Sequence, residues 1–173
     1  MSGTYPITQS FNAVGFTSVF YNLSSTSLSG RTQVRNIAPI AAFIMAQRGM
    51  AEEFTIVLPE ISSKSGNATG TVRTNAAESI GQTSISIDGL SGTLKAGDMI
   101  KFATHNKVYM IVSDRAGNGQ LTIQPSLISA VPNDTIITYD DVPFTVRLNN
   151  DVQAYDLGLA SMVDYEVDFI EAI

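Results

Sequence analysis

The chain of 173 residues contains no cysteine and no tryptophan. The lack of cysteine excludes disulfides, thiolate metal sites and cysteine nucleophiles from this sequence. No segment approaches the ~18 consecutive apolar residues that a membrane-spanning helix needs. The first residues also lack the basic and apolar segments of a secretory signal, so we expect the protein to be made and assembled in a cytoplasm, away from any membrane.

Charged side chains are scarce as well, because they make up 15% of the residues against a usual share of ~25%. The net charge of −6 argues against a non-specific grip on nucleic acid, which needs surfaces rich in Lys and Arg. The charge is still compatible with a channel wall that DNA passes without being bound. A weakly charged surface rich in Ser and Thr suits a protein that packs against other subunits.

The chain contains one pattern twice, since Phe54-Thr55-Ile56-Val57-Leu58 returns as Phe144-Thr145-Val146-Arg147-Leu148. In both copies apolar residues alternate with the period of a half-buried strand. Pro59 follows the first copy and Pro143 precedes the second, which gives both strands clear ends. We therefore predict that the two copies are neighbouring strands of one sheet, and that the segment between them is an insertion.

Residues 64–140 differ from the rest of the chain in their sequence pattern, in which short alternating runs are separated by Gly-rich turns. Strands are predicted at Thr69–Thr74, Thr83–Ile87, Asp98–Phe102, Lys107–Ser113, Gln120–Gln124 and Thr135–Tyr139. The expected core positions are Ile85, Ile87, Leu94, Ile100, Phe102, Val108, Met110, Val112, Leu121, Ile123, Ile136 and Tyr139. The pattern predicts a small inserted β-barrel domain over 64–140, with residues 1–63 and 141–173 forming the second domain.

One helix is predicted, over residues 38–48, on a stripe of Ile37, Ile40, Ala41, Ile44 and Met45 with Gly49 as its stop. Strands are expected at 11–23, at 28–37 and at 162–173. In the last of these, Val163, Tyr165, Val167 and Phe169 are expected to face the core, while Asp164, Glu166, Asp168 and Glu171 lie on the polar side.

No motif in the sequence carries catalysis. His105 is the sole histidine and is expected to be a solvated loop residue without an orienting partner. Gly117-Asn118-Gly119 lacks the GK[ST] and helix of a phosphate loop and is interpreted as a turn. Asp140-Asp141 is interpreted as a charged exit from the insertion rather than a metal contact. Asp164, Glu166 and Asp168 lie roughly 7 Å apart along a strand and cannot share one cation unaided.

Several stretches in this order are similar to a known group of proteins: Ser29–Arg35 before a helix at Pro39–Gln47, Arg48-Gly49-Met50, Phe54–Glu60, Leu94–Asp98, Lys107–Met110 and Val142–Val146. Together they resemble structural proteins of tailed bacteriophages, of the tail-tube, distal-tail and baseplate-ring kind. The likeness covers nearly the whole chain. It implies a β-sandwich or split barrel with one flanking helix, hexameric rings, small domains inserted on the outside, and no enzyme activity or cofactor.

The leading hypothesis is a virion structural protein that forms a ring of the phage tail with other tail proteins. A head decoration or head–tail connector protein is the alternative within structural proteins, and a carbohydrate- or receptor-binding module is the alternative from another class. Arg31, Arg35 and Tyr5 are candidate subunit contacts, with the arm 1–10 reaching a neighbour. Asp164, Glu166 and Asp168 are a candidate acidic stripe facing the channel, where carboxylates would repel phosphate.

Overall fold

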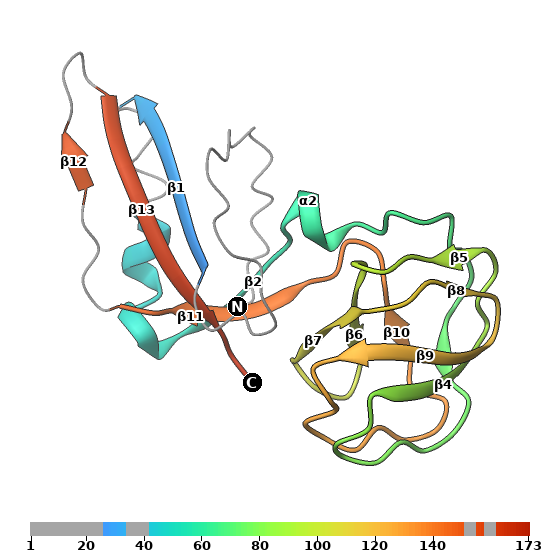
Figure 1. The fold of residues 1–173 in the computed structure, drawn as a ribbon. Helices are drawn as coiled ribbons and strands as arrows, with labels where there is room; N and C mark the ends of the chain where they lie inside the picture. Colours follow the sequence, from blue (N-terminus) through green and yellow to red (C-terminus); the bar gives the residue numbers. More distant parts are fainter. Residues whose placement is uncertain (1–25, 34–41, 151–154, 158–161) are drawn as a thin grey trace.

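The computed structural model describes residues 26–33, 42–150, 155–157 and 162–173 of the chain. It places an open sheet beside a small barrel, with the short helix α2 in the segment that links them (Figure 1). The predicted fold class is confirmed as mainly β, with few helices and a small, nearly closed barrel; the expected β-sandwich or split barrel is represented in the described residues by one open sheet. The described elements are β1 (Thr26–Gln33), η1 (Gly49–Ala51), β2 (Glu53–Ile56), α2 (Pro59–Ser62), β3 (Arg73–Thr74), β4 (Ser84–Asp88), β5 (Thr93–Leu94), β6 (Met99–Phe102), β7 (Val108–Ile111), β8 (Arg115–Ala116), β9 (Gly119–Gln124), β10 (Ile137–Thr138), β11 (Phe144–Leu148), β12 (Tyr155–Leu157) and β13 (Met162–Glu171).

The open sheet has the strand order β1-β13-β11-β2, and every pairing in it is antiparallel. The long strand β13 holds this sheet together, because β1 and β12 pair with its first part and β11 pairs with its last three residues. In the ribbon, β13 and β1 extend well beyond the body of the molecule (Figure 1). The strand predicted over the C-terminal residues is therefore present.

The two similar strands are neighbours, as predicted: β11 pairs with β2 in a register that runs from Phe144 opposite Ile56 to Arg147 opposite Glu53. Phe144 and Val146 on β11 are buried, and Phe54 and Ile56 on β2 are half-buried on the same face. The strand β2 ends at Ile56, two residues before the end of the predicted run, and Pro59 then begins α2.

Residues 42–46 form the described part of the predicted helix, whose first residues, 38–41, lie outside the described residues. Ile44 is buried, as its place on the stripe predicts, but Met45 is 77% exposed and its assignment to the buried stripe is wrong. Phe43 takes the inner position instead, with its ring edge-on to Phe54 at 5.2 Å between centroids. The helix ends where Arg48 and Gly49 adopt left-handed backbone angles, with φ of 53° and 66°.

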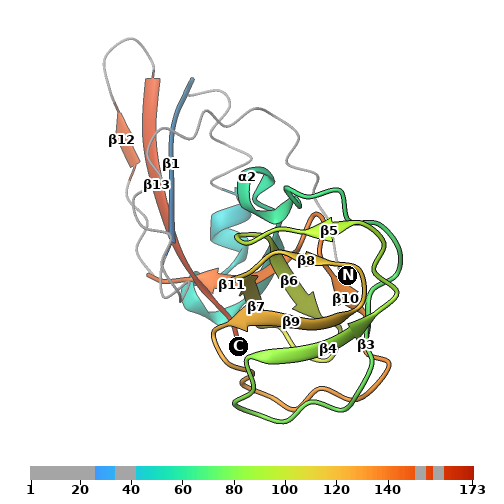
Figure 2. The same cartoon turned by 45° about the vertical axis from the view of Figure 1, so that its right-hand side comes forward.

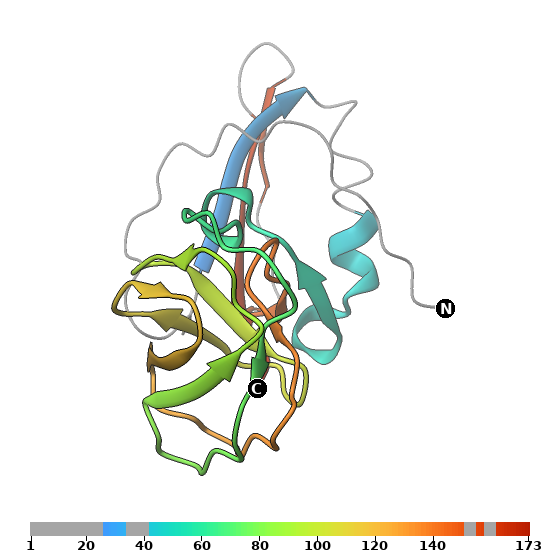
Figure 3. The same cartoon turned by 90° about the vertical axis from the view of Figure 1, so that its right-hand side faces the viewer.

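The inserted segment forms a six-stranded sheet in the order β10-β6-β7-β9-β4-β3. Its two edge strands meet through a bridge between Arg73 and Ile136, and through a hydrogen bond from the Ile137 amide to the Val72 carbonyl (2.9 Å). The sheet is thereby nearly closed into a barrel, which Figures 2 and 3 show from two further sides. A single apolar cluster fills it, with Ile85, Ile100, Tyr109 and Leu121 fully buried.

Four predicted core positions of the barrel differ in the structure. Val112 and Ile136 are exposed, at 39% and 44%, while Val108 and Met110 belong to a second apolar cluster outside the barrel. For Val108, Met110 and Val112 the cause is the direction in which β7 faces. Tyr109 and Ile111 point into the barrel, and the alternate positions are apolar because they meet the open sheet.

Candidate functional site

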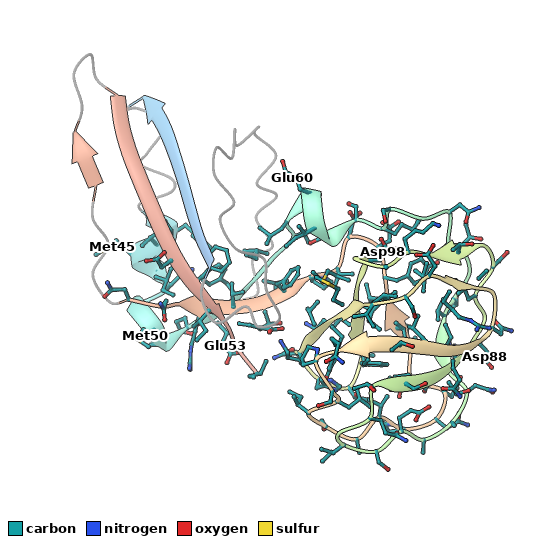
Figure 4. The ribbon with its side chains drawn as sticks, viewed as in Figure 1. Met45, Met50, Glu53, Glu60, Asp88 and Asp98 are labelled. Carbon is teal, nitrogen blue, oxygen red and sulfur yellow. The ribbon has the colours of Figure 1, made fainter. Side chains whose placement is uncertain are left out.

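The open sheet and the barrel meet through the outer face of β6 and β7, which packs on β11 and the end of β13. The buried residues of this junction come from both sides: Leu58, Met99, Val108, Val142, Phe144, Val146 and Phe169, with Phe54, Ile56, Ile61 and Met110 packed against them. The helical segment that carries Met45 and Met50 lies remote from the barrel (Figure 4). The junction is thus an apolar contact built by strands that are distant in the sequence.

A buried ion pair crosses the junction. Lys107, just before β7, donates from Nζ to Oε2 of Glu171, the last residue of β13. The other carboxylate oxygen, Oε1, accepts a hydrogen bond from the amide of Val108 at 2.7 Å. The two charged side chains are only 5% and 4% exposed. Burial of two charges is costly unless each is paired and hydrogen-bonded, and here both conditions are met.

The expectation that Glu171 lies on the polar side of β13 is wrong. Side chains alternate along a strand, so Glu171 shares the face of Phe169, which is 2% exposed. The same parity is readable in the sequence, and it would have placed this carboxylate in the interior. Its partner Lys107 gives no comparable local signal, because the two residues are brought together only by the junction.

A second polar contact lies on the β6 side of the junction. The ammonium of Lys101 donates to the hydroxyl of Thr145 at 3.1 Å and to the carbonyl of Pro143 at 3.4 Å. Desolvation by burial lowers the pKa of Lys101, and the nearby charge of Glu171 opposes that shift. Lys101 also lines a shallow recess with His105 and Thr138, which opens at the end of the barrel beside the junction.

His105 lies in the predicted loop between β6 and β7, but it is half-buried rather than solvated. Its Nε2 lies 2.8 Å from the hydroxyl of Tyr109, and its ring stacks on Phe102 at 5.7 Å between centroids. Burial lowers the pKa of His105 from 6.5, with the positive charge of Lys101 acting in the same direction. Among the described residues the ring bonds to hydroxyls and to no carboxylate, so it has no orienting acid for proton transfer.

The chain enters and leaves the barrel at adjacent points. The amide of Val142 donates to the carbonyl of Ser62 at 3.0 Å, and the hydroxyl of Ser63 donates to Asp141 at 3.1 Å. Lys64 forms an ion pair with Asp140 at 2.5 Å, and its hydrogen bond is the largest cause of the lowered pKa of that carboxyl. The acidic pair at the exit therefore fastens the two crossings of the chain to each other.

Asp98 fastens the entering chain to the barrel. This carboxylate is 2% exposed and accepts hydrogen bonds from the amide and hydroxyl of Ser65 (2.8 and 2.6 Å) and from the amide of Lys95 (2.8 Å). Figure 4 shows Asp98 at the edge of the barrel nearest α2. In the described part of the chain no group of three or more His, Asp or Glu side chains could hold a metal ion.

The Gly117-Asn118-Gly119 segment is a turn, as predicted. Arg115 donates from Nε to the carbonyl of Gly117 at 3.0 Å, and the side chain of Asn118 accepts from the amide of Leu90 at 3.0 Å. These bonds hold the turn against the rest of the barrel.

The residues predicted to act in assembly are only partly described. Tyr5 and Arg35 lie outside the described residues, as does the arm 1–10. Arg31 on β1 stands opposite Asp164 on β13 in the register of the same chain, and Asp168 is half-buried opposite Ser27. The side-chain directions of Asp164 and Glu166 lie outside what the structure describes, so the channel-facing stripe and the subunit contacts stay predictions.

Comparison with known proteins identifies the barrel. Residues 62–139 match the family model described as the B domain of the distal tail protein pb9. The matched segment contains the entering linker and the whole six-stranded barrel, and it ends just before the exit residues Asp140 and Asp141. No curated protein matches the chain.

The match confirms the resemblance to tail structural proteins of tailed bacteriophages. The match, which covers the barrel and not the open sheet, supports a structural role in the phage tail and, with it, contacts with other tail proteins. In the described residues, no helix combines the length and the apolar character that crossing a membrane requires.

Proposed function

We propose that this protein forms an oligomeric ring in the tail, as a tube, distal-tail or baseplate component, and that the ring is a hexamer assembled in the host cytoplasm. The observation that carries the proposal is the position of the matched barrel: it is inserted between β2 and β11, two adjacent strands of a separate sheet. That sheet, with its long strand β13, is then the part that contacts other copies. Ring formation requires unlike surfaces of neighbouring copies to meet and close.

In this proposal the protein has no enzymatic role, and DNA passes through the ring without being bound specifically. The net charge of −6 supports the passage of DNA without binding, because a negative channel wall repels phosphate. The absence of an enzymatic role is supported by His105, whose ring bonds to hydroxyl groups and lacks, within the residues that the structure describes, the carboxylate that orients a general base.

The proposal is tested by counting copies in the tail. Asn133 is exposed in the turn that follows Pro132, so a short epitope tag inserted beside it should leave the barrel folded. Cryo-microscopy of tagged tails with a bound antibody fragment is expected to show a sixfold ring of density at one level. A single fragment per tail contradicts the ring, and fragments on the head favour the decoration or connector alternative.

The carbohydrate-binding alternative finds little support in the barrel. Of its three aromatic residues, Phe102 and Tyr109 are fully buried, and Tyr139 donates its hydroxyl to the carbonyl of Gly70 at 2.7 Å. Glycan-array binding by the purified chain would favour this alternative over a purely structural role.

A further inference from the structure

The junction combines an extensive apolar contact with one buried ion pair, and the two differ in what they specify. Apolar packing is non-directional, so the cluster around Phe144 and Met99 could accept the barrel in more than one orientation. The pair of Lys107 and Glu171 is directional, because both carboxylate oxygens are engaged at once. A rotation of the barrel would separate two charges that are almost fully removed from water.

We propose that the ion pair between Lys107 and Glu171 is an orientation latch. It fixes the angle at which the barrel stands on the open sheet, while the apolar cluster holds the two together. Every copy of the protein then presents its barrel in the same direction.

The position of the two residues supports this role. Glu171 is the last residue of β13, the strand that pairs with β1, β11 and β12, so its carboxylate is fixed by the whole open sheet. Lys107 immediately precedes β7, which pairs with β6 and β9 at the centre of the barrel sheet. The latch thus joins the central strands of the two sheets. When a buried ion pair is replaced by neutral groups of similar volume, the protein often keeps its stability. An experiment can therefore remove the charges and measure the orientation of the barrel in a protein that is still folded.

The chain offers a test without background labels, because it has no cysteine. Thr55 on β2 and Ala76 in the barrel are both exposed and serve as sites for single cysteines carrying spin labels. The distance between the labels is measured by pulsed electron paramagnetic resonance, with labelled chains diluted into unlabelled protein so that only distances within one copy are recorded. The unaltered junction is expected to give one narrow distance distribution.

The test variant combines Lys107→Met with Glu171→Gln. This double change removes both charges and keeps an oxygen that accepts from the amide of Val108. The matched control is Lys95→Met with Asp114→Asn, which removes an exposed ion pair of 2.6 Å from the same barrel. We expect the junction variant to remain cooperatively folded by circular dichroism and to lose the single narrow distribution, while the control variant keeps it.

Two outcomes overturn the proposal. If the junction variant folds and keeps a distribution as narrow as that of the control, the apolar cluster alone sets the orientation. If the junction variant fails to fold while the control folds, the ion pair is required for stability rather than for orientation.

Discussion

Replacement of Ile44 by Ala tests whether the helical segment 42–46 is packed on the open sheet as the structure indicates. The side chain of Ile44 is 4% exposed, so the change removes three carbon atoms from an apolar environment. At about 0.8 kcal/mol for each buried methylene, the transfer contribution is about 2.4 kcal/mol, and the cavity brings the expected loss to about 2–5 kcal/mol. The better helix propensity of Ala offsets only about 0.5 kcal/mol of this loss.

The next residue provides the control. Met45 lies in the same helical segment and is 77% exposed, so Met45→Ala is expected to change stability by no more than about 0.5 kcal/mol. Urea unfolding of the purified variants, followed by far-ultraviolet circular dichroism, measures both free energies, and an unchanged slope shows that the unfolding reaction is the same. A loss below about 1 kcal/mol for Ile44→Ala, or equal losses at the two positions, would refute the assigned packing.

Four further predictions concern the barrel. Tyr109→Phe leaves two polar groups near its hydroxyl without that partner and is expected to cost about 1–3 kcal/mol in urea unfolding, whereas a neutral result would mean that these bonds contribute little. Gly81→Ala is expected to cost about 1–2 kcal/mol because its φ is +86°, and Gly89→Ala should cost more, since its Cβ would also lie 2.2 Å from a backbone oxygen; equal costs would contradict the close approach. Because burial lowers the pKa of His105 below 6.5, its stabilising contribution is complete above that pH and declines as the pH falls through the lowered pKa. The difference in unfolding midpoint between wild type and His105→Asn should therefore shrink from about pH 7 to about pH 5, and a constant difference would argue against burial of the neutral ring. Replacement of residues 64–140 by a short Gly/Ser loop is expected to leave the open sheet cooperatively folded, because the chain enters and leaves the barrel at adjacent points. Its stability should fall, because the junction cluster becomes exposed. Loss of any cooperative transition in circular dichroism would show that the sheet needs the barrel.

Local alternation in the sequence predicts the strands and one of their pairings. The similar runs beginning at Phe54 and Phe144 lie side by side because both carry the same apolar face, bounded by proline. The inserted barrel follows equally from its short strands and Gly-rich turns. These features depend on residues close to each other in the chain, which is the information that periodicity contains.

The junction could not be predicted in the same way. The run Val108-Tyr109-Met110-Ile111 is apolar without interruption, a pattern typical of a strand covered on both faces, but nothing nearby says what covers the second face. The pairing of Lys107 with Glu171 joins residues 64 positions apart and exists only once the two sheets meet. Helical spacing predicts an inward Met45 because it defines a stripe of residues but not the neighbour that lies beneath the stripe.

The two covered faces of β7 have a consequence for how the protein tolerates change. On most strands alternate positions are exposed and accept substitution, but on β7 Val108, Tyr109 and Ile111 are buried and Met110 packs against the junction cluster. A substitution at Tyr109 or Ile111 disturbs the interior of the barrel. A substitution at Val108 or Met110 disturbs the packing of the barrel on the open sheet. A saturation-mutagenesis scan that measures infectivity should therefore find four consecutive intolerant positions on β7. On β4, by contrast, alternate residues are exposed or half-buried, so every second position should accept substitution.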